Sequence, residues 1–224
     1  MEIAVFVLIA AVAGGAAYLA YYLKKKRIQG LATAAKQLGL QFSRNDPFGT
    51  LSEPFQLLQK GDGRDVENVM SGLWQGMGLR QFDYWYYEES TDSQGHRSKS
   101  YYRFNCVIAP IEAACAHLMI DHENMFTRLA DALSFHDIEF ESEEFNRAYQ
   151  VKCSDKKFAN DFVDARMMDW LLAHGDGYTF EVVGDELLCA HKRLQPSELI
   201  PLLGTAKGFH EAVPRVVFEL YAKG

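Results

Sequence analysis

The chain opens with a long apolar stretch before polar and apolar positions begin to mix. Residues 3–23 contain no charged side chain over 21 positions. At about 1.5 Å per residue, a helix of this length measures roughly 31 Å, which matches the hydrocarbon thickness of a bilayer. Tyr18, Tyr21 and Tyr22 lie toward its C-terminal end, and tyrosine favours the membrane interface. The pattern therefore predicts a transmembrane helix.

The charges that flank this stretch indicate its type and orientation. A cleaved signal peptide is the competing interpretation, but such a peptide carries positive charge before a shorter apolar core. Here only Glu2 precedes the stretch, whereas four basic residues follow it at positions 24–27. The flank richer in Lys and Arg usually stays in the cytoplasm. We therefore expect a single-pass anchor in the inner or plasma membrane, with the N-terminus outside and the C-terminal domain cytoplasmic.

Small residues recur four positions apart within the apolar stretch, and such spacing lets two membrane helices approach closely. A homo-oligomer formed through the transmembrane helix is therefore one hypothesis. The alternative is that Ala and Gly are simply common in membrane helices. The pairs are Ala10/Gly14, Ala11/Gly15, Ala13/Ala17 and Ala16/Ala20.

The rest of the chain reads as one domain. We divide the sequence into residues 1–27, the transmembrane anchor with its basic juxtamembrane segment, and residues 28–224, a cytoplasmic domain. Strand-like segments follow one another as antiparallel neighbours, and helical patterns concentrate late in the chain. A regular alternation of strand and helix, typical of a parallel sheet, is missing. The predicted fold class is α+β, with an antiparallel sheet and packed helices.

The predicted elements of this domain, in chain order, begin with a helix over 28–38 that ends at Gly39 and either continues from or bends off the membrane helix. Strands follow at 55–59, 66–74, 78–87, 101–108 and 113–120, and a helix is capped by Asp121. Further segments are strands at 138–140 and 148–153 around a single turn, one helix capped by Ser154 or Asp155 and ending at Gly175, a hairpin of 178–183 and 186–191 about Gly184-Asp185, a helix from Ser197, and a closing segment at 216–221.

Aromatic residues distinguish two of these strands, which we expect to pair through a polar loop at 88–100. Phe82, Tyr84 and Tyr86 share one face, which alternation assigns to the core beneath a helix. Trp85 and Tyr87 lie on the other face, and Tyr101 and Tyr102 are expected on the partner strand. The outer face is a candidate protein-docking surface.

Charge and cysteine content narrow the class of protein. The 23 basic and 30 acidic residues give a net charge of −7, and without Glu2 and the four basic residues at 24–27 the remainder carries −10. This balance argues against nucleic acid as a partner, because phosphate binding needs basic residues. Four widely spaced cysteines, at positions 106, 115, 153 and 189, are expected to be buried thiols in a reducing cytoplasm. An inverted topology would leave disulfides open.

Motifs for known chemistry are weak. The glycine-rich stretch at 72–78 lacks the Lys-Ser/Thr of a phosphate-binding loop, and we interpret it as a glycine bulge. Cys-Ala-His occurs twice, at Cys115–His117 and Cys189–His191, and two facing strands would bring a Cys₂His₂ zinc site together. Chance repetition is the alternative. We therefore assign no catalytic, cofactor-binding or metal residue, and no cofactor.

Several short motifs occur along the domain: ENV at 67–69, FDY at 82–84, ESEEFNRAYQV at 141–151, Asp155, Ala159 and MMDWLL at 167–172. With the apolar N-terminus, these motifs resemble those of a group of uncharacterised bacterial membrane-anchored proteins. The resemblance implies a bacterial source and a shared α+β domain, and it implies no activity.

Three functional hypotheses follow. The first is a membrane-tethered cytoplasmic domain with a protein-interaction or scaffold role, whose anchor raises its effective concentration near a partner. The second is an accessory subunit of a membrane complex. The third is an enzyme with an unrecognised metal-dependent site built from the two Cys-Ala-His segments.

Overall fold

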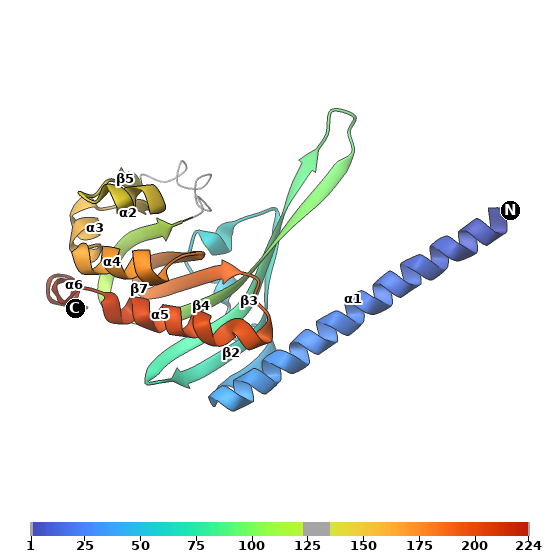
Figure 1. Cartoon of the computed structure of the whole chain (residues 1–224), viewed down its shortest axis with the longest axis horizontal. Coiled ribbons are helices and arrows are strands. Elements are labelled where there is room, and N and C mark those ends of the chain that lie inside the picture. Colours follow the sequence, from blue (N-terminus) through green and yellow to red (C-terminus); the bar gives the residue numbers. More distant parts are fainter. Residues whose placement is uncertain (1, 123–134, 224) are drawn as a thin grey trace.

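The computed structural model describes the backbone of residues 2–122 and 135–223, and the side chains from Ala11 onward within these ranges. A curved antiparallel sheet carries several short helices on one face, and one long N-terminal helix extends away from the sheet (Figure 1). The predicted α+β class with an antiparallel sheet is confirmed.

The sheet is organised around one long strand, β4. Its register pairs β4 with β3 and β6 on one edge and with β7 on the other, and every pairing is antiparallel. The order is β1-β2-β3-β4-β6-β5, with β7 beside β4. The strands are β1 Gln41–Asn45, β2 Gly63–Trp74, β3 Met77–Thr91, β4 Arg97–Asp121, β5 His136–Ile138, β6 Gln150–Cys153 and β7 Tyr178–Lys192.

Two predicted breaks are absent because the strands bend instead of ending. The expected strands at 101–108 and 113–120 are one strand, β4, and the expected hairpin at Gly184-Asp185 is a continuous strand, β7. Gly184 has a φ of 60° and lies opposite Cys115, where the β4–β7 register shifts on both sides. A glycine with positive φ thus forms an irregularity within the ladder, where the sequence pattern indicated a turn.

The glycine-rich stretch at 72–78 is also different from its interpretation. Gln75 and Gly76 have φ values of 48° and 84° and connect β2 directly to β3, so this segment is a tight hairpin turn. The prediction of a glycine bulge there is wrong. The bulge of β2 lies earlier, between Glu67 and Met70.

The long helix α1 differs in length from the short helices that cover the sheet. The helices are α1 Glu2–Leu38, α2 Glu143–Ala148, α3 Lys156–Phe162, α4 Ala165–His174, α5 Leu199–Ala212 and α6 Arg215–Leu220, with 3₁₀ turns η1 Thr50–Ser52, η2 Leu57–Gln59 and η4 Pro196–Glu198. The helix predicted over 28–38 continues from the N-terminal segment as part of α1, and Gly39 follows it with a φ of 72°.

Side-chain caps explain where the later helices begin. Asp155 accepts hydrogen bonds from the amides of Lys157 and Phe158, which starts α3. Asp164 accepts one from Met167, so a second helix, α4, begins where the sequence pattern predicted a single helix to Gly175. The predicted strand at 55–59 contains the 3₁₀ turn η2 instead. The helix expected after Asp121 falls on residues outside the described ranges.

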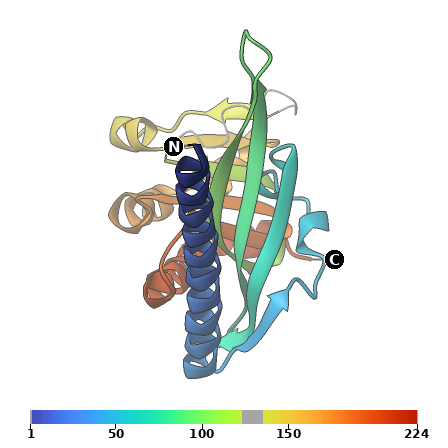
Figure 2. The ribbon, with the colours of Figure 1, turned by 90° about the vertical axis from the view of Figure 1, so that its right-hand side faces the viewer.

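The sheet separates two hydrophobic cores. Figure 2 shows the short helices on one side of the sheet. On one face, α3, α5 and α6 pack against β4, and α1 packs against β1 and β2. Leu31 and Phe209 are fully buried on this face. On the other face, Phe82 and Tyr84 are buried as predicted. Among the described residues, the segment 50–59 with its 3₁₀ turns covers them, where the sequence pattern indicated a helix.

A buried carboxylate fixes this covering segment to the sheet. Glu181 on β7 has a fully buried side chain that accepts hydrogen bonds from the amides of Gln56 and Leu57, at 2.5 and 3.3 Å. His117 on β4 places Nε2 2.6 Å from the same carboxylate. The amides at the start of η2 therefore obtain their acceptors from the sheet.

We expect Glu181→Gln to lower the free energy of unfolding by about 2 kcal/mol, because the new amide nitrogen faces a backbone N–H and leaves it without an acceptor. Urea unfolding of the full chain in a mild detergent measures this. Glu219→Gln, an exposed change on α6, is the matched control. Equal midpoints for the two variants would contradict the assignment.

Candidate functional site

The solvent exposure of the side chains of helix α1 changes at Arg27. Every side chain from Ala11 to Lys26 is exposed, whereas Leu31 and Ala35 are buried in the core. The exposed part projects from the domain (Figure 1). Its large apolar side chains are all more than half exposed: Val12, Tyr18, Leu19, Tyr21, Tyr22 and Leu23. Among the residues with described side chains, no helix combines the length and the apolar character that crossing a bilayer requires.

A buried ion pair attaches α1 to the sheet at this position. Arg27 donates from Nε and Nη2 to the two carboxylate oxygens of Asp83 on β3, each at 2.7 Å. Both side chains are less than a tenth exposed. Arg27 also donates from Nη1 to the carbonyl of Leu194, at 2.7 Å, which ties in the segment after β7.

Neighbouring strands complete the hydrogen bonding of Asp83. Asn68 on β2 and Asn105 on β4 donate to its carboxylate at 3.0 and 2.6 Å, so Asp83 accepts four hydrogen bonds in all. Asn68 lies in the β2 bulge with a φ of 58°, a conformation that Asn tolerates better than most residues. A charge buried this deeply is stable only when it is paired and hydrogen-bonded.

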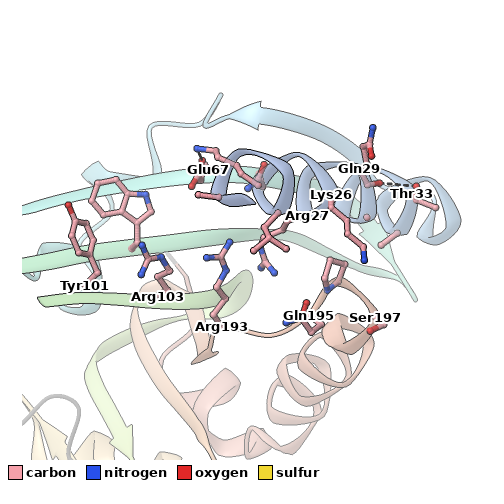
Figure 3. Close-up of a pocket in the computed structure, with 18 of the residues that line it drawn as sticks. Lys26, Arg27, Gln29, Thr33, Glu67, Tyr101, Arg103, Arg193, Gln195 and Ser197 are labelled. Carbon is pink, nitrogen blue, oxygen red and sulfur yellow. Dashed lines mark hydrogen bonds and ion pairs between the residues drawn. The ribbon is translucent and has the colours of Figure 1, made fainter. Parts of the chain in front are cut away.

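An open groove of about 1400 Å³ lies between α1, the β3–β4 strands and residues 193–197 (Figure 3). The charged side chains that line it are Lys24, Lys26, Arg27, Arg103, Arg193 and Glu67. We call this cavity the basic groove, because five of these six side chains are cationic.

Part of the positive charge is neutralised within the groove. Arg27 is paired with Asp83, and Lys24 lies 2.9 Å from Glu67. The described contacts show no carboxylate within ion-pair distance of Lys26, Arg103 or Arg193. Burial, together with the positive charges of Arg27 and Arg103, lowers the pKa of Arg193 from its usual value. The three cations therefore make a local excess of positive charge in an acidic domain.

Aromatic rings border the groove on the side of the hairpin. Trp85 and Tyr101 line it, and Tyr87 joins them, with ring centroids 5.9, 6.4 and 5.4 Å apart in pairs. We call these three residues the aromatic patch. Arg103 lies 5.2 Å above the Tyr101 ring, and Lys99 4.0 Å above that of Tyr87. The prediction that Tyr101 and Tyr102 lie on the partner strand is confirmed, because they pair with Tyr87 and Tyr86.

The two Cys-Ala-His segments lie on neighbouring strands but do not meet. Cys189 lies opposite Val107 of β4, whereas Cys115 lies opposite Gly184 of β7. Eight residues of strand separate these positions along β4, about 25 Å at the usual rise. His117 instead contacts Glu181. No group of three His, Cys, Asp or Glu side chains suited to a metal ion occurs among the described residues.

The cysteines are buried free thiols, as predicted. Burial raises the pKa of Cys115 to about 12 and that of Cys153 to about 11. Burial also raises the pKa of Cys106 and of Cys189 above the usual value. All four are therefore protonated at neutral pH, and a protonated thiol is a weak nucleophile and a poor metal ligand.

Of the cationic residues of the basic groove, sequence reasoning singled out only those of the segment 24–27. It missed Asp83, Asn68 and Asn105, which stand as polar residues inside otherwise apolar or aromatic strands. That contrast was the available signal, because a buried polar residue needs a partner. Nothing along the chain indicated that the partner is Arg27, 56 positions before Asp83.

We expect Arg27→Met to lower the free energy of unfolding by about 3 kcal/mol, because Asp83 then remains buried without its cation. The double variant Arg27→Met/Asp83→Leu should regain part of this loss, because it removes the unpaired charge but leaves the side-chain amides of Asn68 and Asn105 without their acceptor. Denaturant unfolding of the full chain in detergent measures both, and Lys25→Met, an exposed neighbour, serves as the control. A single variant as stable as the control would show that the ion pair does not hold α1.

Comparison with known proteins reveals similarity of fold. No protein-family model matches the chain, and no curated protein does either. The crystal structure of the mycobacterial trehalose monomycolate transport factor A, TtfA, is similar, with a TM-score of 0.56, 12% sequence identity, and coverage of 83% of this chain and 93% of that one. At this identity, the likeness establishes a shared fold.

Proposed function

We propose that this chain is a single-pass membrane protein whose cytoplasmic α+β domain, residues 28–224, is a non-catalytic accessory factor for another component of the same membrane. The observation that carries the proposal is the exposed half of α1. Tyr18, Leu19 and Tyr21 are more than half exposed, and at about 100° per residue they point to different sides of the helix. A helix that is apolar all round normally lies inside a protein core or a bilayer, and here the fold leaves it outside the core.

The sequence supplies the rest of the argument for an anchor. The apolar stretch begins at residue 3 and ends at Leu23, where the basic segment 24–27 starts. Lys and Arg at this position favour the cytoplasmic side and contact anionic lipid headgroups. The domain begins to pack on α1 at Arg27, so the proposed membrane surface and the domain adjoin directly.

The rigid connection distinguishes this arrangement from a domain on a flexible linker. The Arg27–Asp83 ion pair and the buried Leu31 and Ala35 fix the angle between α1 and the sheet. A domain held this way presents one defined surface toward neighbouring membrane components, at high effective concentration. The fold neighbour TtfA is named as a transport factor, which supports an accessory role over an enzymatic one.

An accessory subunit that binds its partner within the membrane is the second candidate. Ala13, Ala16, Ala17 and Ala20 are exposed and spaced for close helix contact. The same feature suits a homo-oligomer formed through the transmembrane helix.

We expect the full chain to stay in the membrane pellet after carbonate extraction, because the apolar stretch lies in the hydrocarbon. Val12→Asp/Ala16→Asp should release much of it, since each carboxylate near the centre of a membrane helix costs about 3 kcal/mol. Val12→Leu/Ala16→Leu is the matched control and should remain in the pellet.

Orientation is tested separately with reporters fused after Gly224. We expect a fluorescent protein that matures in the cytoplasm to be bright and alkaline phosphatase to be inactive, because the basic segment stays inside. An active phosphatase, or wild-type protein in the soluble fraction, would contradict the proposal.

A further inference from the structure

The basic groove lies where the exposed and packed parts of α1 meet. Its lining starts at Ala20 and Leu23 and continues along the helix to Gln37. If residues 3–23 lie in the hydrocarbon, as proposed above, the mouth of the groove is at the depth of the lipid headgroups. The groove is therefore placed to receive a group that belongs to the membrane surface.

The charge of the groove selects an anion. Arg103 lies on β4 and Arg193 directly follows β7, and their side chains lie on the same wall of the groove, across from Lys26 on α1 (Figure 3). Two guanidinium groups offer paired N–H donors that match the oxygens of a phosphate. Polar side chains of Gln29, Ser197 and others on the lining add further hydrogen-bonding groups.

The aromatic patch suits the boundary between headgroups and acyl chains. Tyr101 is 47% exposed, and Trp85 lies beside it on the groove wall. Tyr and Trp have an apolar body and one polar group, and they concentrate at membrane interfaces for that reason. A small soluble anion has no apolar part that could contact these aromatic rings.

We propose that the basic groove binds the headgroup of an anionic phospholipid of the same membrane, with its phosphate on Arg103 and Arg193 and its glycerol region against the aromatic patch. This inference rests on the proposed membrane anchoring. It gives the domain a second contact with the bilayer besides α1, and this contact depends on lipid charge.

The test is native mass spectrometry of the full chain in a neutral detergent, titrated with phosphatidylglycerol or with phosphatidylcholine. We expect the wild type to bind phosphatidylglycerol at least about tenfold more tightly than phosphatidylcholine. Arg103→Glu/Arg193→Glu should abolish this preference. Lys156→Glu/Arg215→Glu makes the same change of charge on exposed residues of α3 and α6, away from the groove, and should keep it.

A milder pair, Arg103→Gln/Arg193→Gln, is measured beside the charge reversal in case the latter does not fold. Circular dichroism and the unfolding midpoint establish which variants are folded. Loss of the preference in a folded groove variant, with the control unchanged, supports the proposal. A wild type without preference overturns it, and so does an equal loss in the groove and control variants.

A final arm separates a lipid from a free phosphate. Inorganic phosphate and glycerol phosphate are added to the complex with phosphatidylglycerol, and we expect neither to displace the lipid at millimolar concentration. Displacement would show that the groove takes a soluble anion and would overturn the lipid assignment. Headgroup binding is measured in detergent and anchoring by extraction from membranes, so either result can fail without the other.

Discussion

The ion pair of Arg27 with Asp83 is the contact on which the arrangement of the whole molecule depends. It lies almost entirely out of water, and it joins helix α1 to a carboxylate that Asn68 and Asn105 also hold. Four parts of the chain, α1, β2, β3 and β4, therefore meet at one point, and Leu194 adds a fifth. Moving Arg27 away from Asp83 would leave a buried carboxylate without its cation, which is strongly destabilising. This contact therefore determines how the long helix is directed relative to the sheet.

The sheet that carries Asp83 is organised around the long strand β4. Strand β4 is long enough to pair with β3, β6 and β7. Register shifts near Cys115 and Gly184 let β4 and β7 continue as paired strands where the sequence pattern indicated breaks. Each face of the sheet has its own cover: helices on one side, and on the other the segment 50–59, held by Glu181. The basic groove forms at the end of the sheet where α1 replaces the short helices as the cover.

The sequence predicted what local patterns determine and missed what tertiary contacts determine. Alternation placed the aromatic strands and their pairing, and Gly39 correctly marked the end of the first helix. The split between α3 and α4 was missed because Asp164 resembles any other helical polar residue until its cap is seen. The groove was not predictable, because its cations come from three distant segments of the chain, and no single segment carries a motif for an anion site.

The polar tip of the β3–β4 hairpin constrains how a bilayer would lie against this molecule. Both views place the tip, near Thr91 and Arg97, on the same side of the domain as the N-terminal half of α1 (Figures 1 and 2). Charged side chains are costly to place in hydrocarbon. On the proposed anchoring, α1 must therefore tilt in the bilayer so that the tip of the hairpin stays outside the hydrocarbon.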